Sequence, residues 1–175
     1  FLVGEPSAAR IDDVKVDTSF RKGEITASAA LVNLNADGQY TMSARITEKG
    51  RIVKKFNSAV FRKGDLKSGC VSFNVKWMPD KLWDIHTPQN VFSLQLSLLE
   101  KEGKLLDTTH EVRFGFREFW IDGRDFYLNG SRIFLSAVPL DSAQGGAASA
   151  TYAAASESLL RLKGFGINMV YTHNY

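Results

Sequence analysis

The 175-residue chain has one cysteine and three histidines, and both shortages exclude kinds of site. Cys70 cannot form a disulfide within the chain, and in its strand-like run a thiol is expected to pack as a small hydrophobic side chain rather than act as a nucleophile. His86, His110 and His173 lie far apart in sequence, without the close spacings of zinc sites. We therefore expect no metal and no other cofactor in this chain.

Long apolar runs and concentrated charge are also missing. No run of about 18 apolar residues occurs, so we expect no membrane-spanning segment and no membrane partner. The net charge of +3 comes from Lys and Arg residues scattered singly or in pairs, which predicts a mixed-charge surface and no nucleic-acid partner. The chain begins at Phe1 without a Met or a leader peptide, so we interpret it as a fragment of a longer protein whose compartment the sequence does not reveal.

The sequence does contain regular alternation of apolar and polar residues. Residues 1–10 hold Gly, Pro and Ser and are predicted to be a linker, whereas residues 11–117 read as short strands separated by glycine-containing turns. Seven or so strands over about 100 residues predict an immunoglobulin-like β-sandwich. The apolar positions that alternate are Val14 and Val16; Ile25, Ala27, Ala29 and Leu31; Tyr40, Met42, Ala44 and Ile46; Val71, Phe73, Val75 and Trp77; Phe92, Leu94, Leu96 and Leu98; and, in a last strand through His110, Val112 and Phe114.

The pattern changes after Arg117. Asn129-Gly130 between apolar runs predicts a tight hairpin, and the run 133–138 is apolar on both parities, as in a buried strand. A helix is expected from Ser149 or Thr151 to the glycines 164 and 166, and 167–171 reads as another buried strand. Strand, helix and strand in this order predict the opening βα unit of an eight-stranded barrel, which needs about 250 residues in full.

Three segments resemble one enzyme family. Phe114-Gly115-Phe116-Arg117, Leu128-Asn129-Gly130 and the stretch 162–170 (LKGFGINMV) are similar to the entry into the catalytic barrel of glycoside hydrolase family 2, the β-galactosidase, β-glucuronidase and β-mannosidase group. The resemblance implies a sandwich at 11–117 and the truncated start of the barrel at 118–175. It also implies a carbohydrate substrate, a preceding jelly-roll domain and the rest of the barrel in the same protein, and secretion or a periplasmic location.

The resemblance also bears on the chemistry. Family members use two glutamates in a retaining mechanism, and Glu111, Glu118 and Glu157 do not match those positions, so no catalytic residue is expected in this chain. Barrel sites lie at the C-terminal ends of strands. The substrate-binding residues predicted there, implied by the resemblance, are His173, Asn174 and Asp141.

Two departures from the family pattern leave alternatives open. Tyr171 stands where the family has an arginine, and Asn174 stands where it has a substrate-contacting histidine. A structural scaffold without activity is the alternative that fits these departures, whereas a non-catalytic carbohydrate-binding or adhesion sandwich would explain residues 1–116 alone. Trp77 and Trp83 are expected to pack in or at the edge of the core, with a sugar-stacking platform as the lesser interpretation.

Overall fold

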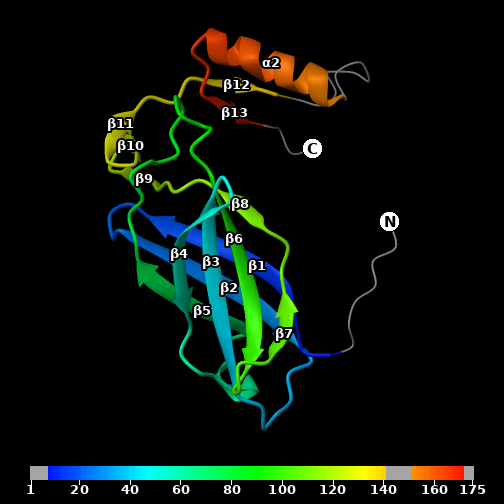
Figure 1. Ribbon diagram of the computed structural model, residues 1–175. Coiled ribbons are helices and arrows are strands. Elements are labelled where there is room, and N and C mark those ends of the chain that lie inside the picture. Colours follow the sequence, from blue (N-terminus) through cyan, green and yellow to red (C-terminus); the bar gives the residue numbers. More distant parts are fainter. Residues whose placement is uncertain (1–7, 141–150, 172–175) are drawn as a thin grey trace. The chain divides into compact units, whose positions relative to one another are not determined.

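The computed structural model describes residues 8–140 and 151–171. The chain divides into two compact units, residues 1–118 and 119–175. The described part is mainly β, with one α-helix (Figure 1). No helix among the described residues is long and apolar enough to cross a membrane.

The first unit is an antiparallel β-sandwich. One sheet has the order β1-β2-β5, and the other has the order β4-β3-β6-β7, with β8 also paired to β6 (Figure 1). The strands are β1 (Arg10–Ser19), β2 (Glu24–Val32), β3 (Tyr40–Glu48), β4 (Arg51–Asn57), β5 (Cys70–Lys76), β6 (Phe92–Glu100), β7 (Leu105–Thr108) and β8 (Val112–Phe114), and a 3-10 turn spans Lys63–Asp65.

The core of this unit lies between the two sheets. Alternate residues of β2, β3 and β6 are almost completely buried, as the alternation predicts. In the β3–β6 pair the register places Ile46 opposite Leu94 and Met42 opposite Leu98, so large side chains of the two strands meet on the inner face. Full burial of an Ile or Leu side chain contributes about 1.5–3 kcal/mol, so these strands supply much of the hydrophobic stabilisation.

Of the two turns at which a glycine with positive φ is predicted, Asp37-Gly38 and Lys49-Gly50, only the second has it. The β3–β4 hairpin turns through Lys49 and Gly50, with φ angles of 49° and 79°. The sequence predicts a single last strand through His110, but the structure has two strands here, β7 and β8, with a break between them. At the break, Thr109 Oγ1 accepts a hydrogen bond from the Leu96 N–H (3.1 Å), which replaces a regular ladder contact.

The second unit contains two small sheets and the helix. The strands β9 (Phe119–Asp122), β10 (Asp125–Leu128) and β11 (Ser131–Ile133) form an antiparallel sheet, and β12 (Ala137–Pro139) pairs in parallel with β13 (Met169–Tyr171). Asn129 and Gly130, with φ angles of 49° and 85°, form the predicted hairpin turn between β10 and β11. The apolar run 133–138 is not one strand, since it is divided between β11 and β12.

Helix α2 (Tyr152–Gly164) connects the parallel strands and is capped at both ends. Thr151 is the N-cap, and its hydroxyl accepts a hydrogen bond from the Ala154 N–H (3.2 Å). After the helix, the Ile167 N–H donates to the Leu162 carbonyl and the Gly166 N–H to the Lys163 carbonyl. These two bonds form a Schellman motif, in which Gly166 takes the left-handed conformation with φ of 79°.

Candidate functional site

The predicted substrate-binding residues Asp141, His173 and Asn174 lie outside the described residues. The strands that lead to two of them are described. Pro139 of β12 pairs with Tyr171 of β13, so the two parallel strands end at the same level. Asp141 and His173 each follow in sequence two residues after one of these paired strand ends.

Asn168 holds the start of β13 against the chain that leads into β12. Its Nδ2 donates to the Phe134 carbonyl (2.7 Å), and its Oδ1 accepts from the Ser136 N–H (2.9 Å). Its own N–H donates to the Ser136 carbonyl (3.1 Å). The side chain therefore extends the pairing beyond the three-residue strands and fixes their register, a positioning role that the sequence pattern does not reveal.

The parallel strands are exposed in this chain. Met169 and Val170 each retain 40% of their accessible surface, although the sequence predicts a buried strand here. The physical reason is that, within the described residues, β13 has one neighbouring strand and α2 contains no buried residue. Leu160 and Phe165 at the C-terminal end of the helix region are also exposed.

The segment Phe114–Arg117 is built into the end of the sandwich by aromatic packing. The Phe116 side chain is fully buried and meets Trp77 edge-on, with ring centroids 5.7 Å apart. A Cβ atom at Gly115 would lie 2.5 Å from Trp83 Cβ, so only glycine allows the tryptophan to approach the backbone there. The Trp83 N–H donates to the Phe116 carbonyl (3.0 Å). Arg117 completes the packing with its guanidinium carbon 4.2 Å from the Trp83 ring centroid.

Glu118 ends the first unit in a cluster of hydrogen bonds. Its carboxylate accepts bonds from the Arg21 side chain (2.6 and 2.8 Å), the Arg21 N–H (2.9 Å) and the Ser19 hydroxyl (3.0 Å). Burial alone would raise the pKa of the Glu118 carboxyl, but the bonds from Arg21 and Ser19 outweigh burial and hold the pKa below its usual value. This carboxylate is therefore committed to a structural ion pair.

Residues 9–117 match the model of the glycosyl hydrolases family 2. The chain belongs to this family. No individual curated protein sequence matches the chain.

Solved structures similar to the family 2 chain have the same fold over nearly its whole length. A GH2 β-galacturonidase from Eisenbergiella tayi matches 95% of this chain and 29% of its own, with 19% identity and a TM-score of 0.64. A β-glycosidase from Bacteroides vulgatus matches 95% and 21%, with 18% identity and a TM-score of 0.66. The β-D-mannosidase from Dictyoglomus thermophilum matches 93% and 21%, with 24% identity and a TM-score of 0.62. The chain thus spans less than a third of the length of each.

Trp77 and Trp83 of this family 2 chain pack against neighbouring side chains. Trp77 makes edge contacts with Phe92 and Phe116, and Arg117 lies over the ring of Trp83. These contacts favour the packing interpretation over a sugar-stacking platform. Within residues 8–140 and 151–171, no group of three or more His, Cys, Asp or Glu side chains could hold a metal ion.

Proposed function

We propose that this chain is part of a glycoside hydrolase acting on β-linked glycosides, in which an immunoglobulin-like sandwich at 11–117 precedes the start of a catalytic barrel at 118–175. The observation that carries this proposal is the parallel β12–α2–β13 unit, which follows the family 2 sandwich in sequence after the small β9–β11 sheet. Parallel strands joined by a helix are the repeating unit of an eight-stranded barrel.

The exposure of the parallel strands supports a larger barrel. Parallel sheets occur in proteins with both faces covered, because their crossover helices and further strands bury them. Met169 and Val170 are apolar and exposed here, and a two-stranded parallel pair has little independent stability. Further strands and helices of the same protein would bury these residues.

The proposed chemistry uses carboxylates that this chain does not supply. A retaining glycosidase needs two carboxyl groups about 5 Å apart, one as nucleophile and one as acid and then base. Glu118 is bonded to Arg21 and Ser19, and Glu157 is paired with Arg161 (2.5 Å). Both carboxylates are already held by ion pairs with arginine, which supports a catalytic pair of glutamates outside this chain. The chain by itself is then inactive.

The strand ends are the proposed place for substrate contacts. β12 and β13 end at the same level, at Pro139 and Tyr171. The residues that follow the two strands in sequence are therefore expected at the same edge of the sheet, where barrel enzymes bind their substrates. Asp141, His173 and Asn174 are proposed to donate and accept hydrogen bonds with sugar hydroxyls at that edge. Asn168, which holds the two strands in register, would position them.

The test is an assay of the protein extended along its reading frame beyond Tyr175 on a panel of chromogenic β-glycosides. We expect turnover by the extended protein, none by the 175-residue chain, and a loss of about a thousandfold or more when either strand-end glutamate is replaced by Gln. A matched control replaces Glu157, whose partner Arg161 lies on the same helix, and should keep the activity.

Two results would contradict the proposal. An extended protein without strand-end glutamates and without turnover would indicate a scaffold. Saturable binding of neutral sugars by the 175-residue chain, again without turnover by the extended protein, would indicate a carbohydrate-binding module.

A further inference from the structure

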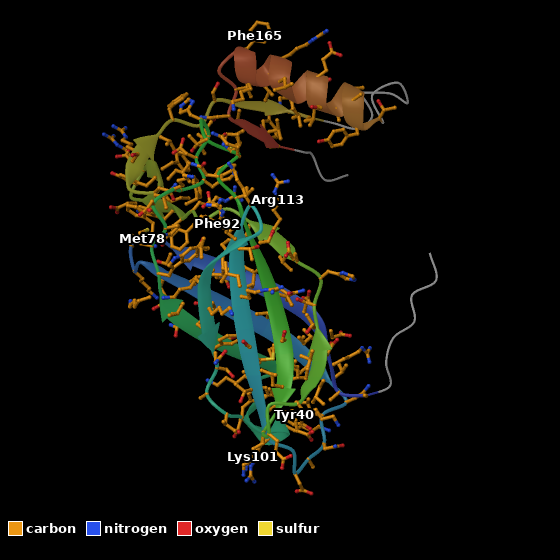
Figure 2. The ribbon with its side chains drawn as sticks, in the orientation of Figure 1. Tyr40, Met78, Phe92, Lys101, Arg113 and Phe165 are labelled. Atoms are coloured by element: carbon orange, nitrogen blue, oxygen red, sulfur yellow. The ribbon has the colours of Figure 1, made fainter. Side chains whose placement is uncertain are left out.

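A cavity of about 300 Å³ lies in the first unit, between the β3–β4 turn, the segment that leads into β6, and β8. Lys49, Lys81 and Arg113 bring three positive charges to it, and Glu48 brings one negative charge. Phe92 also lines the cavity, and its ring packs against Trp77 and Phe114. Figure 2 shows Phe92 and Arg113 at the same end of the sandwich, with Tyr40 and Lys101 at the opposite end.

The charges around the cavity do not cancel. Glu48 Oε1 lies 3.1 Å from Lys81 Nζ, so this carboxylate is paired with one of the three cations. Among the described residues, no carboxylate forms an ion pair with Lys49 or Arg113. The cavity therefore has two cations without an ion-pair partner among the described residues, an arrangement that attracts an anion.

The backbone of Lys49 is a second, independent feature. Its φ of 49° lies in the left-handed region, where Asn, Asp and Gly are the usual residues of such hairpin turns. A lysine at this position keeps a long cationic side chain beside the cavity in spite of the unfavourable backbone. Unfavourable backbone conformations of this kind are concentrated at binding sites.

We propose that this cavity binds the carboxylate of an acidic sugar residue, a uronic acid. Arg113 and Lys49 would bind the carboxylate, because charge-assisted hydrogen bonds to guanidinium and ammonium groups are the strongest available to such a group. The side-chain amide of Gln89 and the hydroxyl of Ser93, which also line the cavity, suit sugar hydroxyls. A volume of about 300 Å³ is at the lower end of the range for small-molecule sites and is sufficient for a single sugar ring.

The choice of a sugar rests on the proposed function, whereas the choice of an anion rests on the cavity alone. The experiment titrates the 175-residue chain with methyl β-glucuronide, with the neutral methyl β-glucoside and with inorganic sulfate, followed by two-dimensional NMR. We expect the glucuronide to shift the amide signals of Phe92 and Arg113, and the glucoside to bind at least about tenfold more weakly. A higher salt concentration should weaken the binding of the glucuronide, because the site is open to solvent and its charges are screened.

Two variants locate the site. Arg113→Gln removes an exposed cation without an ion-pair partner in the described structure, so the fold should persist and the glucuronide affinity should fall about tenfold or more. Lys49→Asn removes the second cation and keeps a residue that tolerates positive φ, with the same expected result. Lys101→Gln, at the opposite end of the sandwich, is the matched control and should leave the affinity unchanged.

Three outcomes would overturn this inference. Equal affinity for glucoside and glucuronide would show that the carboxylate is not recognised, and an unchanged affinity in Arg113→Gln would place binding elsewhere. Sulfate binding as tightly as the glucuronide would show a general anion site without sugar recognition. None of these results depends on turnover, so they are separate from the assay of the extended protein.

Discussion

Tyr40 is the largest fully buried side chain of the sandwich, and its hydroxyl has a specific task. Tyr40 Oη accepts a hydrogen bond from the Asn35 N–H (3.0 Å) and so fixes the loop before β3. A Cβ at Gly38 would lie 2.2 Å from the same oxygen, which explains a glycine in this turn better than its φ angle does. The Tyr40 hydroxyl therefore holds the loop before β3, and the loop needs a glycine at position 38 to leave room for the ring.

We expect Tyr40→Phe to lower the free energy of unfolding by about 1–3 kcal/mol, because the Asn35 N–H loses its partner while the ring stays buried. Urea unfolding followed by tryptophan fluorescence measures the change. Tyr152→Phe is the control, since this tyrosine is 92% exposed and the same loss of a hydroxyl should change stability by less than about 0.5 kcal/mol. Equal effects of the two substitutions would contradict the assigned role.

Glu118 gives the first unit a pH-dependent contribution to stability. Its pKa in the folded protein is below the ordinary value of 4.5, so the unfolded chain binds the proton more readily. The contribution is fully present above pH 4.5 and is lost as the pH falls through the lower folded-state pKa. We expect Glu118→Gln to destabilise the first unit by about 1–2 kcal/mol at pH 7. The difference in stability between this variant and the native chain should become smaller as the pH falls below 4.5.

Thermal unfolding between pH 7 and pH 3 measures this effect. Glu102→Gln, an exposed residue in the turn between β6 and β7, is the control and should show no such pH-dependent difference. A Glu118→Gln variant whose deficit stays constant over the whole pH range would mean that the carboxylate charge is not what stabilises the cluster.

At the scale of the element, two glycines near the end of α2 have different roles. The sequence predicts that both end the helix, but Gly164 is its last residue and only Gly166 has a positive φ. Neither has an atom within 4 Å of an added Cβ, so a methyl group tests the backbone alone.

We expect opposite results from the two alanine substitutions. Gly166→Ala should disfavour the C-terminal end of α2 by about 1 kcal/mol because of its left-handed backbone, whereas Gly164→Ala should be neutral or favour the helix by up to about 1 kcal/mol. The helical signal in circular dichroism at 222 nm, recorded at low temperature, measures both. Two substitutions of the same sign would show that the Schellman motif does not end the helix.

The sequence predicts elements well where one face alone is buried. β2, β3 and β6 alternate strictly, so their core residues and their turns could be identified in advance. The run 133–138 could not be divided correctly, because apolar residues on both parities give no period. The break between β7 and β8 could not be predicted either, because it depends on a hydrogen bond from the Leu96 N–H to the Thr109 hydroxyl, 13 positions along the chain.

The candidate site was less accessible to sequence reasoning than the fold. Arg21 and Glu118 are separated by 97 positions, and no local pattern indicates their ion pair. The role of Asn168 likewise requires Phe134 and Ser136, which only the fold brings near it. The roles proposed for Asp141, His173 and Asn174 stay predictions that rest on the family resemblance.

At the scale of the whole molecule, the two units differ in how much core they contain. The described part of the second unit has a single buried apolar residue, Leu128, whereas the first unit holds the continuous core cluster between its two sheets. A small unit with so little buried apolar surface cannot offset the conformational entropy lost on folding.

We therefore expect a chain cut to residues 1–118 to unfold cooperatively, and a chain cut to residues 119–175 to show no cooperative transition. Differential scanning calorimetry of both pieces measures this directly. A sharp heat-absorption peak from the 119–175 piece would contradict the expectation, and with it the argument that the parallel strands need further chain to cover them.

Pro139 has a consequence for how a barrel could close. The Leu140 N–H points toward β13, where it donates to the Tyr171 carbonyl (2.8 Å), so the neighbouring Pro139 nitrogen faces the opposite edge of β12. Proline has no N–H, and that edge consequently lacks a donor at this position. If β12 is the first strand of a barrel, the final strand must meet it there, and the sheet would lack one hydrogen bond where it closes, near the C-terminal end of β12.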